Sequence, residues 1–195
     1  EAGRKKKRQV VFDDFAAVAE DLIRRRITSQ RHLGNKGSSN GGLLMGVQLT
    51  QRPDLWNAVI IGVPLLDMVR YHLLLAGASW MGEYGDPSKP EEAAFLRRIS
   101  PYHNLRPGTR YPAPYVFTST RDDRVHPGHA RKFVARMADI GAPFYYYESG
   151  EGGHAAAVAT TVNAQALHQS LEMTYLWRQL KKGTAAEPIK VLSSD

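Results

Sequence analysis

The stretch "GSSNGG", Gly37 to Gly42, lies between a short β-prone run and a run with helical spacing. It contains the pattern G-x-S-x-G, which places a serine on a sharp strand-to-helix corner. Glycines are expected two residues before and after that serine, because side chains there would collide across the tight turn. Only Ser39 meets this condition, since Ser38 has no glycine at either distance. The stretch therefore predicts a strand, a corner and a helix, with Ser39 as a candidate nucleophile.

Strand-like and helix-like runs alternate on both sides of this corner. Trp56 to Pro64 is a continuous, β-branched apolar run, typical of a strand buried on both faces of a parallel sheet, and Ala113 to Thr120 is a second candidate. The segment 65–108 is irregular, which indicates an excursion near a site. We expect strands at 31–37, 56–64, 113–120 and 143–149, and helices at 12–26, 40–51, 90–99, 127–141 and 159–180. This alternation predicts an α/β fold, a mostly parallel sheet flanked by helices.

The composition limits the function classes. With 195 residues, 43% of them hydrophobic, the chain is long enough for one domain with a sizeable core. It has no cysteine, which excludes disulfides, thiolate nucleophiles and cysteine-based zinc sites. No apolar run approaches the roughly 18 to 20 residues that a membrane span needs, so we expect a soluble protein.

The net charge of +7 comes largely from two basic runs, Gly3 to Arg8 and Ile23 to Arg26. The second run closes the helix expected from Phe12, in which Asp13 and Asp14 stand early and the arginines late, as the helix dipole favours. Basic runs can bind nucleic acid or anionic lipid. Because no aromatic residues interleave here to stack bases, we interpret both runs as solvent-exposed.

Two residues at the ends of predicted strands could activate a serine nucleophile. A serine hydroxyl needs a histidine base, itself oriented by a carboxylate. Asp122 follows the strand at 113–120 and His154 follows the strand at 143–149, at the carboxyl ends where sites of open α/β sheets collect. Asp122 has an alternative interpretation as a helix cap or turn residue.

A metal site has little support in the sequence. His126 and His129 form a pair in "HPGH", but no carboxylate or third histidine stands at suitable spacing. There is also no phosphate-binding loop and no dinucleotide fingerprint. We expect no metal and no cofactor.

A series of motifs gives the chain a specific resemblance. In this order and at these intervals, "DDFAAVAEDL", "GSSNGGLLMG", "QRPDLW", "PLLDM", "SWMGEYGDP", "SPYHN", "STRDDRVHPGHARKF" and "EGGH" resemble the catalytic domain of the prolyl oligopeptidase family of serine peptidases. The resemblance covers about Phe12 to Leu180. It implies an α/β-hydrolase fold, of which the chain would hold the C-terminal portion.

The resemblance also implies a set of site residues. It assigns Ser39 as the nucleophile, Asp122 as the acid and His154 as the base, and it gives the backbone N–H of Asn40 to the oxyanion hole. Arg124 would hold a substrate carbonyl, unless it forms an ordinary surface ion pair. Trp80 would stack on the proline ring at the cleavage position, unless it is a core aromatic. Its expected pocket neighbours are Tyr84, Leu65 and Val125.

Several features depart from the family pattern. Members have a β-propeller and, ahead of "DDF", sheet strands with a segment that supplies a tyrosine hydroxyl to the oxyanion hole; none of these stands in the 195 residues. We therefore expect a fragment of a larger enzyme or a truncated relative. Asn35 replaces an apolar residue, Ser38 replaces a glycine, and Ala155 and Ala156 stand where glycines are expected after the histidine.

These observations lead to one main hypothesis and two alternatives. The main one is a serine peptidase that hydrolyses short peptides after proline through an acyl-enzyme. The first alternative is an esterase or acyl-peptide hydrolase with the same triad. The second is an inactive domain kept for folding or for self-association through exposed sheet edges.

The remaining expectations concern partners, location and domain limits. We expect a short peptide substrate, no nucleic acid and no membrane. A cytoplasmic location is favoured, with the periplasm or secretion left open. The expected limits are a basic connection at 1–11, the C-terminal part of the catalytic domain at 12–182 and a polar tail at 183–195.

Overall fold

The computed structural model describes residues 3–155 and 160–181. The strands are β1 (Gly34–Ser38), β2 (Ala58–Gly62), β3 (Tyr115–Ser119) and β4 (Tyr145–Ser149). The helices are α1 (Gln9–Arg24), α2 (Asn40–Gln51), α3 (Met81–Tyr84), α4 (Pro90–Arg98), α5 (Pro101–Asn104), α6 (Gly128–Asp139) and α7 (Val162–Leu180), with short 3-10 turns between them. The expected tail at 183–195 and the expected helix start at 159 lie outside the described residues, and the domain limits stay a prediction.

The four strands form one parallel sheet in the order β1-β2-β3-β4. Every residue of β2 and β3 is buried, as their apolar runs predict. The expected strand at 31–37 was wrong at its start, because Gln30–His32 is a 3-10 turn and β1 begins at Gly34. The polar side chains of Arg31 and His32 are exposed there, and parallel pairing begins only where Gly34 meets Ala58.

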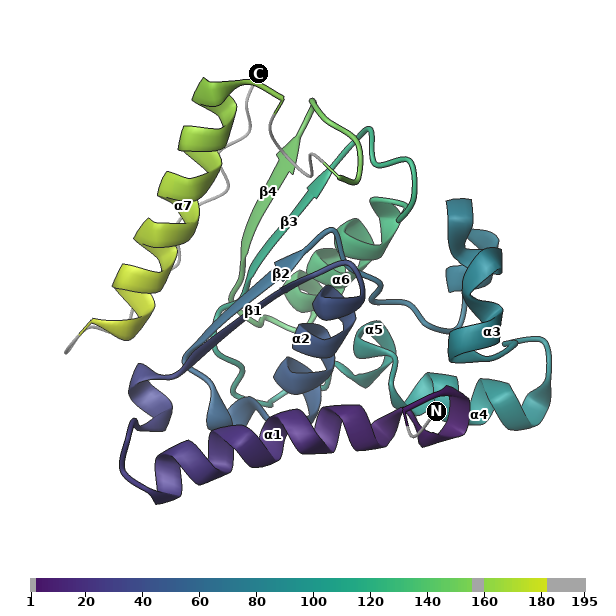
Figure 1. Ribbon diagram of the computed structural model, residues 1–195, viewed down its shortest axis with the longest axis horizontal. Helices are drawn as coiled ribbons and strands as arrows, with labels where there is room; N and C mark the ends of the chain where they lie inside the picture. The colour runs from purple at the N-terminus through teal and green to yellow at the C-terminus, as the bar shows by residue number, and fades with distance from the viewer. Residues whose placement is uncertain (1–2, 156–159, 182–195) are drawn as a thin grey trace.

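Helices cover both faces of the sheet (Figure 1). Val59 and Ile61 of β2 point to the face where α1, α2 and α6 pack, and this cluster includes Met45 and Phe133. The alternate residues of the strands point to the other face, where Tyr175 of α7 joins a second cluster with Ala58, Ile60, Tyr115 and Phe117. These two clusters confirm the α/β architecture that the sequence predicts.

Helix α1 begins at Gln9, three residues before the expected start at Phe12. Its buried face consists of Phe12, Ala16 and Ala19, which lie at helical spacing against the core. The acidic residues Asp13 and Asp14 therefore stand outside the first turn, where the helix dipole acts most strongly. The dipole argument was correct only for the C-terminal end, where Arg24 lies in the last turn.

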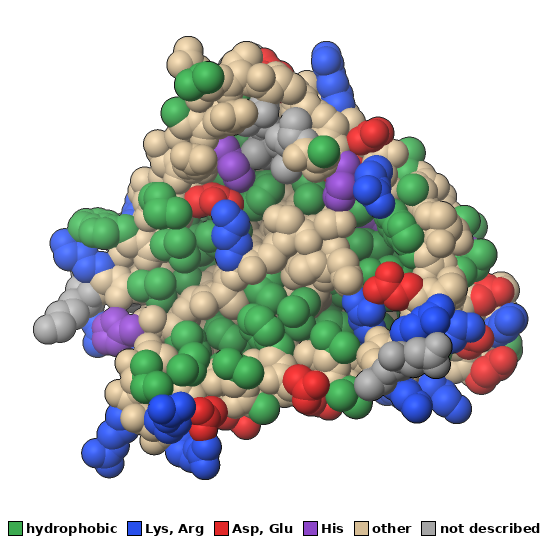
Figure 2. Space-filling view, viewed as in Figure 1, with side chains coloured by type: hydrophobic (Ala, Val, Ile, Leu, Met, Phe, Trp, Pro, Cys, Tyr) green, Lys and Arg blue, Asp and Glu red, His purple; other side chains and the backbone are tan. Residues whose placement is uncertain are grey.

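The surface seen in Figure 2 carries charges of both signs, and lysine and arginine side chains gather beside acidic ones near the N-terminus. Within the described ranges, no helix has the length and apolar character required to cross a membrane.

We expect Asn35→Val to stabilise the protein. Asn35 of β1 is 6% exposed and shares a sheet face with Val59, and neither its amide nitrogen nor its amide oxygen has a hydrogen-bond partner among the described residues. Removing a buried polar group without partners should raise the free energy of unfolding by about 1 to 3 kcal/mol. Urea denaturation of both proteins measures this change.

Asn57→Val is the matched control, because the Asn57 side chain donates to the carbonyl oxygens of Arg31, at 3.0 Å, and Gln179. That variant should lose stability. Equal destabilisation by both substitutions would contradict the prediction.

Candidate active site

The corner between β1 and α2 presents Ser39. Its backbone has φ 57° and ψ −117°, a positive φ that is unfavourable for a residue with a side chain. Two backbone hydrogen bonds hold this conformation, from the Ser39 N–H to the Gly62 carbonyl at 2.9 Å and from the Leu43 N–H to the Ser39 carbonyl at 3.1 Å. The chain thus leaves the strand abruptly and enters the helix with Ser39 at the turn.

The corner depends on glycines at Gly37 and Gly42. A Cβ on Gly37 would lie 2.4 Å from the Gly41 carbonyl oxygen, and a Cβ on Gly42 would lie 2.8 Å from the Gly62 carbonyl oxygen. A Cβ on Gly41 would meet no atom within 4 Å. The expectation that a side chain two residues after Ser39 would collide across the turn was therefore wrong. The residue that must lack a side chain is instead Gly42, where α2 passes the end of β2.

The loop after β3 carries Asp122 and the loop after β4 carries His154, and together they place these side chains beside Ser39. His154 Nε2 lies 3.0 Å from Ser39 Oγ, and His154 Nδ1 lies 2.8 Å from Asp122 Oδ2. The Asp122 side chain is fully buried and that of His154 is 12% exposed. Because a carboxylate only accepts hydrogen bonds, the Nδ1 proton points to Asp122 and Nε2 is left to accept from the serine hydroxyl.

The Asp122 carboxylate has a second set of contacts. Its Oδ1 accepts the backbone N–H groups of Arg124, at 3.0 Å, and Val125, at 2.9 Å. Asp122 is therefore also a turn residue, which is the alternative that the sequence offered for it. The turn contacts fix the carboxylate while Oδ2 faces the imidazole, so the two interpretations are compatible.

Two residues that the sequence analysis did not single out position the histidine loop. Asp123 Oδ1 accepts the backbone N–H of His154 at 2.9 Å, and this bond lowers the pKa of the Asp123 carboxyl. Ser119, the last residue of β3, donates to the Gly152 carbonyl oxygen at 2.5 Å. The doubled aspartate in "DDRV" and the serine at a strand end were visible in the sequence, but only the tertiary contacts distinguish their roles.

The expected substrate-binding residues lie around one apolar cluster. Leu65, Tyr84 and Val125 are buried in it, and Trp80 packs against it while partly exposed. The Arg124 side chain is exposed at the turn that holds Asp122. Of the five expected residues, Trp80 and Arg124 therefore have side chains that reach the surface, and the other three are buried.

Asn40, the first residue of α2, is contacted by two side chains. Its Oδ1 accepts the Tyr84 hydroxyl at 2.9 Å and the Arg8 guanidinium at 2.5 Å. Burial raises the pKa of Tyr84, so its hydroxyl keeps the proton that it donates. The interpretation of the first basic run as solvent-exposed was wrong for Arg8, which is 8% exposed.

The histidine pair in "HPGH" has structural partners. His129 is buried, and burial lowers its pKa to about 4, so that its neutral Nδ1 accepts the backbone N–H groups of Leu66 and Asp67 at 3.2 and 3.1 Å. His126 Nδ1 accepts the Gly128 N–H at 2.9 Å. In the described part of the chain, no group of three or more His, Cys, Asp or Glu side chains could hold a metal ion.

Comparisons with known proteins identify the family of the chain. The model of the prolyl oligopeptidase family matches residues 1–183. An uncharacterized peptidase of Sinorhizobium fredii is 59% identical over 180 residues, which is 92% of this chain and 24% of that protein. A prolyl endopeptidase of Elizabethkingia miricola is 44% identical over 138 residues, 70% of this chain and 20% of that protein.

Solved structures show the same fold. That of a post-proline cleaving enzyme from Rickettsia typhi superposes with a TM-score of 0.89 at 40% identity, covering 92% of this chain and 26% of that one. The chain thus spans about a fifth to a quarter of the length of these relatives. Its parallel sheet and flanking helices match their α/β-hydrolase catalytic domains, and the chain belongs to the prolyl oligopeptidase family.

Proposed function

We propose that this chain carries the catalytic centre of a serine peptidase that hydrolyses short peptides after proline. The observation that carries the proposal is the continuous hydrogen-bonded series from Ser39 Oγ through His154 to Asp122, with distances of 3.0 and 2.8 Å. Family membership supports the peptidase class. The relatives named as prolyl endopeptidase and post-proline cleaving enzyme support the choice of proline.

The geometry suits acyl transfer. Ser39 Oγ would attack the peptide carbonyl carbon while His154 Nε2 takes its proton, and Asp122 would stabilise the resulting imidazolium. His154 would then return the proton to the leaving amine, and water would release the acyl group by the same steps in reverse. Asn40 starts α2, so its N–H has no partner within the helix and can donate to the developing oxyanion.

Trp80 is the side chain of this site that suits a proline ring. Its partly exposed indole lies on the apolar cluster that contains Tyr84 and Val125, and Val125 immediately follows the turn that holds Asp122. An aromatic face at this place could pack on a pyrrolidine ring, which offers a flat apolar surface and no N–H group. Arg124, exposed on the same turn, could donate to a neighbouring substrate carbonyl.

Fluorophosphonate labelling followed by peptide mapping tests the nucleophile. We expect a covalent adduct on Ser39 and none on Ser38, because the hydroxyl of Ser39 is the one within hydrogen-bond distance of the His154 imidazole. Labelling should vanish in Ser39→Ala and persist in Ser38→Ala. An adduct that survives in Ser39→Ala would rule out this nucleophile.

A substrate comparison tests the specificity. Hydrolysis of prolyl amides in preference to matched alanyl amides would support the proposal. Hydrolysis of simple esters alone would favour the esterase, and a protein that neither labels nor hydrolyses any of these would be an inactive domain. The assays use the longest natural form of the protein, so that any residues outside these 195 are present.

A further inference from the structure

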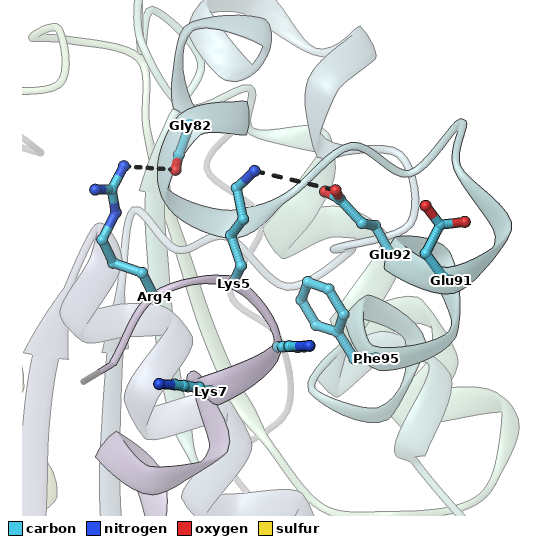
Figure 3. A pocket seen from close by; sticks show the side chains of 8 residues that line it. Arg4, Lys5, Lys7, Gly82, Glu91, Glu92 and Phe95 are labelled. Atoms are coloured by element: carbon cyan, nitrogen blue, oxygen red, sulfur yellow. Dashed lines mark hydrogen bonds and ion pairs between the residues drawn. The ribbon is translucent and has the colours of Figure 1, made fainter. Parts of the chain in front are cut away.

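The first basic run packs against the segment that follows Trp80. Figure 3 shows Arg4 and Lys5 pointing toward α3 and α4, where Arg4 donates to the Gly82 carbonyl oxygen at 2.8 Å and Lys5 lies 4.0 Å from Glu92. These two side chains border a cavity of about 1050 Å³. The run thus contacts both α3 and α4 while residues 4–7 stay exposed, and Arg8 stands at its end.

The Arg8 side chain turns inward and makes three contacts. Its Nη1 lies 2.6 Å from Glu83 Oε1, its Nη2 donates to Asn40 Oδ1 at 2.5 Å, and its guanidinium carbon lies 4.9 Å from the centre of the Tyr84 ring. A planar guanidinium presents separate nitrogens to two acceptors while its face lies on an aromatic ring, whereas the three donors of an ammonium share one nitrogen at the end of a flexible stem. Burying a charge is costly, so this arrangement needs all of its partners.

Two donors thus converge on one oxygen beside the nucleophile. Arg8 and the Tyr84 hydroxyl both donate to Asn40 Oδ1, and Asn40 directly follows Ser39. Tyr84 is 3% exposed and packs edge-on against Tyr71 at 5.6 Å between ring centres, so its hydroxyl is a rigid donor. The Asn40 side chain is held from two elements, the run before α1 and the helix α3, which also contact each other through Arg8.

We propose that Arg8 is a positioning residue, which fixes the Asn40 side chain and thereby aims the Asn40 backbone N–H at the oxyanion. This inference rests on the proposed function of the site. A helix-terminal N–H stabilises a transition state only when it lies about 3 Å from the developing charge, and a small rotation of the first residue moves it away. Arg8 itself would touch neither substrate nor the reacting atoms.

The first variant is Arg8→Lys, which keeps the charge and can keep the pair with Glu83 but has no second nitrogen to hold Asn40 in the fixed geometry of the guanidinium fork. We expect kcat for a prolyl amide to fall about 10-fold, less than the 100-fold or more lost with a whole oxyanion donor, with KM little changed. Tyr84→Phe removes the second donor and should lower kcat in the same way. The matched control is Lys7→Met, an exposed residue of the same run, which should leave kcat and KM unchanged.

A double-variant cycle separates positioning from general stability. Asn40→Ala keeps the backbone N–H but removes the oxygen that Arg8 holds, so adding Arg8→Lys to it should cause no further fall in kcat. Suppose that the wild type is active. If the kcat losses of Asn40→Ala and Arg8→Lys multiply in the double variant, or if Arg8→Lys alone has the kcat of the wild type, the inference is wrong while the proposed function stands. A wild type that neither hydrolyses peptides nor labels at Ser39 would overturn both.

Discussion

Asp122→Asn should lower kcat for a prolyl amide by about 10⁴-fold, the loss typical of a triad whose histidine is held in the wrong tautomer. The asparagine would fit the space, and its Oδ1 could still accept the backbone N–H groups of Arg124 and Val125. The amide NH₂ would then face His154 Nδ1, which lies 2.8 Å from Oδ2. Nδ1 would become an acceptor, and Nε2 would carry the proton and could no longer take one from Ser39.

Asp123→Asn is the matched control, because it removes the same charge one residue along the same turn. Its amide oxygen can still accept the His154 N–H, now bonded to Asp123 Oδ1 at 2.9 Å. We expect a loss of less than about 10-fold in kcat, since no triad proton is affected. Single-turnover kinetics of both variants measure the difference, and equal losses would show that charge rather than tautomer is what Asp122 supplies.

Gly37→Ala should destabilise the fold by about 3 kcal/mol or more, because an added Cβ would overlap backbone atoms that have no room to move. The Cβ would lie 2.4 Å from the carbonyl oxygen and 2.6 Å from the carbonyl carbon of Gly41. Relief requires α2 to shift away from β1, which would also displace Ser39 from His154. Denaturant unfolding measures the loss, and fluorophosphonate labelling of the folded fraction reports the displacement.

Gly41→Ala, at the second glycine of the G-x-S-x-G pattern, should not destabilise the fold. A Cβ there meets no atom within 4 Å, and residue 41 lies in α2, where alanine is favoured over glycine by about 0.5 to 1 kcal/mol. The variant should be as stable as the wild type or slightly more so. Equal destabilisation by both substitutions would mean that the corner is tighter than its backbone positions indicate.

The sheet could be predicted from the sequence because its two central strands, β2 and β3, consist largely of apolar residues. Ala58–Gly62 and Tyr115–Ser119 are buried at every residue, and burial on both faces requires the unbroken apolar runs that the sequence displays. Strand β1 has no such apolar run, since its sequence is GNKGS. It could be placed only from the corner that follows it, and its start was wrong by three residues.

The residues proposed as triad partners could be located from the sequence as far as chain order and strand ends determine them. Asp122 and His154 follow β3 and β4, and the structure links Ser39 to His154 and His154 to Asp122 by hydrogen bonds. Arg8 could not be predicted, because a basic run looks the same whether it is solvated or folded inward. Its burial depends on Glu83 and Tyr84, which lie 75 and 76 positions further along the chain, a pairing that local spacing does not encode.

The separation of the reacting groups along the chain has a consequence for biosynthesis. Ser39 and His154 are 115 residues apart. At roughly 5 to 20 residues per second, a ribosome adds the histidine about 6 to 23 s after the serine. A nascent chain would therefore hold Ser39 for that time without the histidine proposed as its base, and the serine could not be activated until the strand and loop carrying His154 have joined the sheet.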